Sequence, residues 1–78
     1  MFKVIVQIDK ADHYLTTAGI YAPVADCVPH GDEVAEHEAK EFRTMEGAVS
    51  AYYHSGEQYK GFIYNVKTKQ REKIAGTT

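Results

Sequence analysis

The clearest pattern along the chain is an amphipathic stretch that leads into a hydrophobic one, between residues 42 and 66. Apolar residues recur at helical spacing, in the order Met45, Ala48, Val49, Tyr52. Thr44 precedes this stripe as a suitable N-cap, and Gly56 follows it as a suitable left-handed residue to end a helix. The pattern therefore predicts a helix over residues 45–54.

Residues 58–66 predict a strand with apolar side chains on both faces, which is typical of a central or covered strand. Phe62, Tyr64 and Val66 share one face, and we expect them to form the core with the helix stripe. Tyr59 and Ile63 share the other face. Residues 70–74 predict a polar strand whose charges protect an exposed sheet edge.

The N-terminal third predicts two further strands. Residues 2–8 alternate cleanly, with the apolar side chains on one face. Residues 9–13 read as a polar connection, and residues 14–22 predict a second strand that Pro23 ends. A short helix capped by Asp12 is the alternative, which Thr16, Thr17 and Gly19 disfavour. Residues 24–32 have no periodicity and predict a loop.

Residues 34–42 are ambiguous between a helix and a strand. Their Ala, Glu and Lys content favours a helix with a thin apolar stripe. The short Arg43-Thr44 junction favours a strand that leads into the next helix, and this is the interpretation we adopt. The chain then predicts a single α+β domain over residues 1–78, with an antiparallel sheet of four or five strands and one helix packed on one face.

Composition sets further limits. The chain has 78 residues, and its single cysteine, Cys27, cannot form an internal disulfide. No apolar run approaches the roughly 20 residues that span a bilayer, and the N-terminus lacks the pattern of a signal peptide. We expect a soluble, cytoplasmic protein whose oligomeric state, including a dimer, stays open.

Charge is unevenly distributed although the formal net charge is only −2. Residues 26–46 hold seven acidic side chains against Lys40 and Arg43, whereas residues 47–78 hold five basic side chains against Glu57 and Glu72. Such asymmetry predicts two differently charged surfaces, or two halves that complement each other in a small fold.

Candidate chemistry is sparse. Cys27, His30 and His37 are metal-ligand types close together in the sequence, but their spacing matches no zinc pattern. No nucleophile motif or glycine-rich phosphate loop is present. We expect a protein without catalytic residues, metal or cofactor, which is not an enzyme.

The charge pattern gives two hypotheses for a working surface. The first is an acidic, tyrosine-containing surface that binds a larger protein or ribonucleoprotein complex, formed by Glu36, Glu38, Glu41, Glu46, Tyr53 and His54. The alternative is a basic hairpin over residues 59–73 that binds nucleic acid, with amines on phosphates and rings on bases. Its residues are Tyr59, Lys60, Lys67, Lys69, Arg71 and Lys73.

Residues 41–48 (EFRTMEGA) and 63–69 (IYNVKTK) carry a resemblance of style. The chain resembles small α+β accessory proteins of bacteriophages and mobile elements, including those of the anti-CRISPR kind. This resemblance implies an inhibitor that binds a large host nuclease, or its nucleic-acid-recognising subunit, and blocks it. It carries no functional residue over to this chain.

Overall fold

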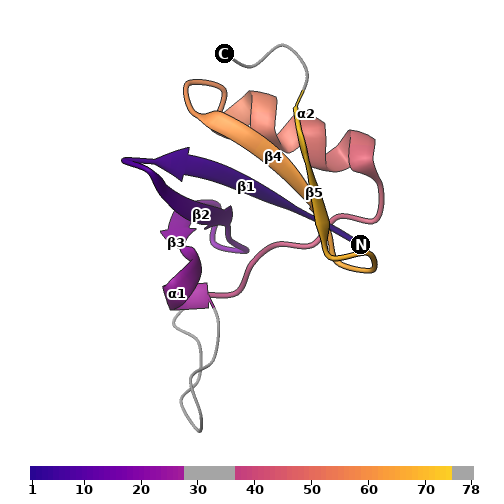
Figure 1. Cartoon of the computed structure of the whole chain (residues 1–78), viewed down its shortest axis with the longest axis horizontal. Helices are drawn as coiled ribbons and strands as arrows, with labels where there is room; N and C mark the ends of the chain where they lie inside the picture. The colour runs from indigo at the N-terminus through magenta and orange to yellow at the C-terminus, as the bar shows by residue number, and fades with distance from the viewer. Residues whose placement is uncertain (28–36, 75–78) are drawn as a thin grey trace, which may run out of the picture.

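The fold is an antiparallel five-stranded sheet with a helix on one face (Figure 1). The computed structural model describes residues 1–27 and 37–74. The sheet order is β3-β2-β1-β4-β5, with strands β1 (Phe2–Ile8), β2 (Ala11–Leu15), β3 (Tyr21–Pro23), β4 (Lys60–Asn65) and β5 (Gln70–Lys73). The helices are α1 (Val24–Cys27) and α2 (Met45–Ser55). Neither of these two helices has the length and apolar character needed to cross a membrane.

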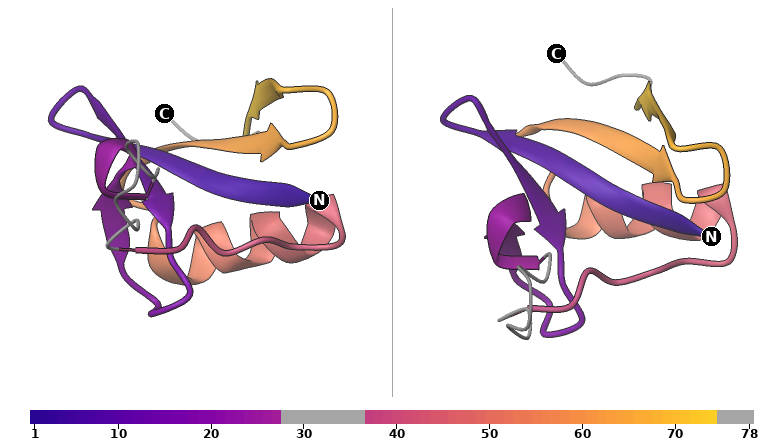
Figure 2. Two further views of the ribbon diagram at one scale, coloured as in Figure 1. Left: turned by 90° about the horizontal axis from the view of Figure 1, so that it is seen from below. Right: turned by 60° about the horizontal axis from the view of Figure 1, so that its bottom comes forward.

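The α+β architecture predicted from the sequence is confirmed. Helix α2 lies along one face of the sheet and packs on β1 and β4 (Figure 2). The predicted strand over residues 2–8 is confirmed, and the predicted helix ends one residue later than expected. The polar strand β5 is an edge strand, as its charges indicate, because it pairs only with β4 among the described strands.

The caps of α2 are partly as predicted. Thr44 is the N-cap, and its side-chain oxygen accepts a hydrogen bond from the Gly47 amide at 3.1 Å. Gly56 ends the helix, but its φ of −133° shows that the expected left-handed conformation is wrong. A glycine is needed here for space, because a Cβ atom would collide with the Tyr21 hydroxyl and lie 3.1 Å from Val6.

The core lies between α2 and the covered face of the sheet. Tyr52 and Ala48 of the helix are fully buried against Val4, Val6 and Ile63. The expectation that Phe62, Tyr64 and Val66 would form this core is wrong, because β4 turns Ile63 toward the helix. Met45 is also more exposed than its place in the apolar stripe predicts, at 40%.

Gly61 explains why β4 faces the helix in this way. A Cβ atom at Gly61 would collide with the ring of Tyr52. The glycine therefore makes room for the largest buried side chain of the core. The Tyr52 hydroxyl donates to the carbonyls of Glu57 and Tyr59, so its polar end is also satisfied.

The N-terminal hairpins differ from the sequence prediction. Strand β2 begins at Ala11, and only Asp9 and Lys10 connect it to β1, with φ values of 52° and 68°. These left-handed values match the two-residue turns that suit the twist of a hairpin. Residues 14–22 are not one strand, because the chain reverses after Thr16 and returns as β3. Thr16 holds this turn by hydrogen bonds from its amide and hydroxyl to the Ile20 carbonyl.

The segment before α2 is extended along the sheet. Ala39 forms an isolated bridge with Thr16, and Phe42 exchanges two backbone hydrogen bonds with Phe2, at 2.8 and 2.7 Å. The helical alternative is therefore wrong for residues 37–42, although the segment is not a continuous strand either. Residues 24–27 form a helical turn instead of the expected loop. The rest of the predicted loop (residues 28–32) and the start of the predicted strand (residues 34–36) lie outside the described residues.

Candidate nucleic-acid interface

The face of the sheet opposite α2 carries aromatic and basic side chains. Register places Tyr64 between Lys3 and Arg71, and Phe62 between Ile5 and Lys73. Tyr14 and Asp12 of β2 join the same face opposite Ile5 and Gln7. We call this surface the open face, defined by Lys3, Ile5, Gln7, Asp12, Tyr14, Lys60, Phe62, Tyr64, Arg71 and Lys73.

The cations and rings of the open face contact each other. The Lys3 ammonium lies 5.3 Å from the centre of the Tyr14 ring, and the Arg71 guanidinium lies 4.9 Å from the centre of the Phe62 ring. Both distances are within the range of a cation–π interaction. The rings are half-buried, so each keeps part of its surface in solvent.

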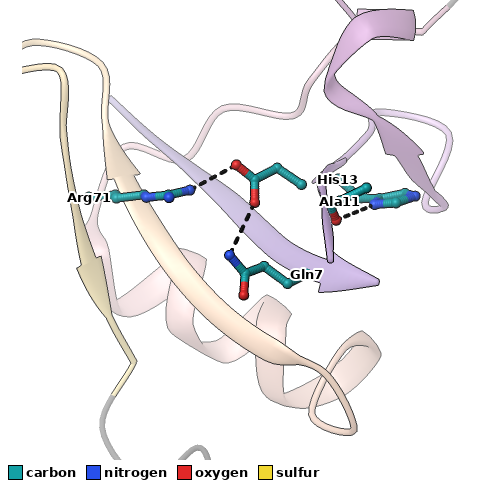
Figure 3. A network of polar contacts seen from close by, with 5 residues as sticks. Gln7, Ala11, His13 and Arg71 are labelled. Atoms are coloured by element: carbon teal, nitrogen blue, oxygen red, sulfur yellow. Dashed lines mark hydrogen bonds and ion pairs between the residues drawn. The ribbon is translucent and has the colours of Figure 1, made fainter. Parts of the chain in front are cut away.

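The open face is concave. Asp12 on β2 and Arg71 on β5 are three strand spacings apart, roughly 14 Å in a flat sheet. Their side chains nevertheless meet, with the Arg71 Nη1 atom 2.9 Å from the Asp12 Oδ2 atom. The other carboxylate oxygen accepts a hydrogen bond of 3.4 Å from the Gln7 amide (Figure 3). The sheet must therefore curl around this side.

Both partners of this ion pair line a pocket of about 310 Å³. Ile5, which is 4% exposed, contributes to its lining, as do the rings of Tyr14 and Tyr64. Lys69 and Arg71 add two cations. The volume is at the lower end of the range for small-molecule sites, and its lining combines flat apolar surface with positive charge.

The Tyr14 hydroxyl stays protonated in this setting. Burial raises its pKa above the ordinary value, and the neighbouring Tyr64, Cys27 and Asp12 raise it further. Arg71 acts in the opposite direction, but its effect is the smallest of these. Tyr14 can therefore both donate and accept a hydrogen bond at the wall of the pocket.

The structure places most of the predicted nucleic-acid-binding residues on or near the open face. Lys60, Arg71 and Lys73 belong to it by register, and Lys69 lines its pocket. Lys67 is exposed in the turn that joins β4 to β5. Tyr59 is the exception, because it is half-buried and packs against the hydrophobic core.

Sequence reasoning missed the contribution of the N-terminal strands to the open face. Lys3, Tyr14 and Phe62 were not assigned to it, although all three lie on it. The alternation of β1 places Lys3 opposite its apolar face, which is a signal that the sequence contains. Which strands neighbour β1 is not visible in that alternation, so the cluster could not be assembled from it.

The residues of the acidic surface are separated by the fold. Glu46, Tyr53 and His54 are exposed on α2, with Glu46 and Tyr53 seven residues apart on one side of it. Glu38 and Glu41 are exposed in the extended segment before α2, and Glu36 lies outside the described residues.

A second groove runs between α2 and β5. It has a volume of about 310 Å³, and its lining includes Met45, Val49, Tyr53, Ile63 and Ile74. Glu72 and Lys73 also line it. Tyr53 is 42% exposed at this groove, while its ring makes an edge contact with buried Tyr52 at 5.3 Å between ring centres. The predicted acidic surface thus borders an apolar groove that the sequence did not indicate.

The metal-ligand types are dispersed among the described residues. No three His, Cys, Asp or Glu side chains there are grouped to hold a metal ion. The Cys27 thiol donates to the Ala22 carbonyl at 3.8 Å, and burial raises its pKa. His30, the residue predicted nearest to it, lies outside the described residues.

Comparison with known proteins gives no relative. No protein-family model, curated protein or solved structure matches this chain.

Proposed function

We propose that this protein is a non-enzymatic binding protein whose open face binds single-stranded nucleic acid. The observation that carries the proposal is the register of β1, β2, β4 and β5, which gathers three aromatic rings and four basic side chains on the face opposite α2. Rings stack on bases and cations meet phosphates, so this combination suits an unpaired strand.

The arrangement favours single strands over duplexes. Tyr14, Phe62 and Tyr64 offer flat surfaces only to bases that are free of their own stack. The concave surface would follow a flexible strand more closely than a rigid rod. No base-specific hydrogen bonding is needed for this mode of binding, and we expect modest sequence preference.

The distribution of charge also supports binding of nucleic acid on the open face. Asp12 is the sole carboxylate among the open-face residues, whereas Glu46 is on the helix side of the sheet. Glu72 also lies on the helix side, because it pairs with buried Ile63. Among the open-face residues, a phosphate backbone would therefore meet four basic side chains and one carboxylate.

Fluorescence anisotropy with a labelled oligothymidylate of about ten nucleotides tests the proposal, in low salt where phosphate contacts are strongest. We expect binding that weakens steeply with added salt and exceeds that of a matched duplex. The double substitution Arg71→Ala with Lys73→Ala should weaken binding by about tenfold or more. The matched control is Lys40→Ala with Arg43→Ala, which removes the same charge from the segment before α2 and should have little effect.

Two outcomes would contradict the proposal. The first is an absence of binding by the unmodified protein at tens of micromolar. The second is an equal loss of affinity in both double variants, because this would indicate a response to net charge alone. Circular dichroism of each variant confirms that the fold is retained before the affinities are compared.

A second candidate function is favoured by the groove beside α2. Met45 and Tyr53 are among the most exposed large apolar residues described, at 40% and 42%, and both line this groove. Exposed tyrosines are frequent anchors of protein interfaces. A protein partner at the helix layer would agree with the inhibitor role that the resemblance implies, in which the chain blocks a larger host assembly.

Copurification from a host lysate with the unmodified chain and with Glu36→Lys, Glu38→Lys, Glu41→Lys together tests this second candidate. We expect a larger protein or ribonucleoprotein complex with the unmodified chain and its loss with the triple variant. Retention of the complex by the triple variant removes the acidic surface from consideration. A Tyr53→Ala variant then tests the groove separately.

A further inference from the structure

The pocket on the open face has the chemistry of a nucleotide site, and both partners of an ion pair line it. Its aromatic lining comes from Tyr14 on β2 and Tyr64 on β4, and Ile5 on β1 adds apolar surface. Lys69 and Arg71 stand at the side of β5. Flat rings and an apolar contact suit a base, and two cations suit a phosphate that is covalently attached to it.

The Asp12 carboxylate is paired with the Arg71 guanidinium, which a bound phosphate would need. The Asp12 carboxylate accepts from Arg71 at 2.9 Å and from Gln7 at 3.4 Å (Figure 3). The side chains of Arg71 and Asp12 are 43% and 37% exposed, so the pair is accessible from solvent. Exposed ion pairs contribute little to stability, and a second anion can therefore displace this one at small cost.

We infer that this pocket seats one nucleotide of the bound strand, with its base against Tyr14 and Tyr64 and its phosphate on Arg71. In the free protein the Asp12 carboxylate holds the position of that phosphate on Arg71. Binding then exchanges one anion for another, and Asp12 sets an upper limit on the affinity. This inference rests on the proposed function and identifies the residue that restrains it.

The substitution Asp12→Asn removes the competing charge and keeps the shape of the side chain. The amide oxygen of asparagine can still accept the hydrogen bond from Gln7. Because an exposed ion pair is weak, we expect the variant to bind labelled oligothymidylate about three- to fivefold more tightly in low salt. Glu46→Gln is the matched control: it makes the same change in net charge on α2, and its affinity should equal that of the unmodified protein.

An abasic oligonucleotide of the same length tests the base contact without changing the protein. It keeps every phosphate and lacks the stacking surface, so we expect the unmodified protein to bind it about tenfold or more weakly. The substitution Tyr64→Leu should reduce this difference between the two strands. Equal affinity of the unmodified protein for both strands would overturn the base site.

The outcomes separate this inference from the proposed function. If the unmodified protein binds oligothymidylate and Asp12→Asn binds no more tightly than Glu46→Gln, the inference is wrong and the proposed function stands. If neither the unmodified protein nor Asp12→Asn binds, the proposed function itself fails. A melting temperature of Asp12→Asn close to that of the unmodified protein shows that the comparison concerns binding and not folding.

Discussion

The two faces of the sheet are made by the same strands but have different physical characters. On the covered face, β1 and β4 supply Val4, Val6 and Ile63, which are at most 3% exposed. On the open face, the same strands supply cations and half-buried rings such as Lys3 and Phe62. The comparison separates what folds the chain from what is free to bind, because only the covered face contacts α2.

The covered face depends on close packing around one tyrosine. Tyr52 is fully buried, and Gly61 leaves the space that its ring fills. The rings of the open face have no such dependence, since they are partly solvated and contact flexible cations. We therefore expect substitutions on the covered face to change stability, and substitutions on the open face to change binding.

The largest effect is expected for Gly61→Ala. The new Cβ atom would collide with the Tyr52 ring, and neither the strand nor the buried ring can move without disturbing the core. We expect a loss of about 3 kcal/mol in the free energy of unfolding, measured by urea denaturation. Gly47→Ala is the control, because its Cβ atom would lie 3.2 Å from the Thr44 hydroxyl in a helix that favours alanine, and the two effects oppose each other.

A Gly61→Ala protein as stable as the unmodified one would contradict the difference in packing between the two faces. It would mean that the core tolerates an extra methyl group where the covered face has least room. The proposed division between a tightly packed face and an adaptable face would then lose its basis.

The next effect in size is expected for Tyr52→Phe. This change keeps the ring but removes the hydroxyl that donates to the carbonyls of Glu57 and Tyr59. We expect a loss of about 1–2 kcal/mol in the free energy of unfolding, because two partly buried hydrogen bonds are lost. Tyr64→Phe is the matched change on the open face, and we expect its effect on stability to be smaller than about 0.5 kcal/mol.

Equal losses for Tyr52→Phe and Tyr64→Phe would show that the open face contributes to folding as the covered face does. Tyr64→Phe keeps the ring that would stack on a base, so both variants should bind the labelled oligonucleotide much as the unmodified protein does.

The sequence predicted the elements of this fold better than their pairing. The helical stripe, the Thr44 cap and the alternation over residues 2–8 depend on neighbours in the chain, and each is confirmed. The face of β4 was predicted wrongly because Phe62 and Tyr64 outweigh a lone Ile63 in hydrophobicity. Gly61 decides the matter, because its missing side chain admits the Tyr52 ring.

The open face could be predicted only in part. Arg71, Lys73 and Lys60 follow from the charge pattern of the hairpin. Tyr14 and Asp12 belong to a strand that the sequence did not separate correctly, because the turn after Thr16 carries no strong breaker besides Gly19. The contact between Asp12 and Arg71 spans 59 residues and requires a curled sheet, which no local pattern encodes.

The smallest effect concerns alkaline pH and compares a tyrosine from each face. Burial raises the pKa of both Tyr52 and Tyr14, so the folded protein holds these protons more tightly than the unfolded chain. Their stabilising contribution is complete below the unfolded value near pH 10 and is lost as pH rises through the higher folded-state pKa. Stability should therefore fall as pH rises above about pH 10.

The two tyrosines are distinguished by measuring this fall in Tyr52→Phe and Tyr14→Phe. Tyr52 is fully buried and Tyr14 is half-buried, so removing the Tyr52 hydroxyl should reduce the alkaline loss of stability more. Urea midpoints at several pH values give the comparison directly. A larger reduction in Tyr14→Phe would show that burial together with Tyr64, Cys27 and Asp12 raises the pKa of Tyr14 more than the surroundings of Tyr52 raise its pKa. The charges around the open-face pocket would then outweigh the deeper burial of the covered face in determining alkaline stability.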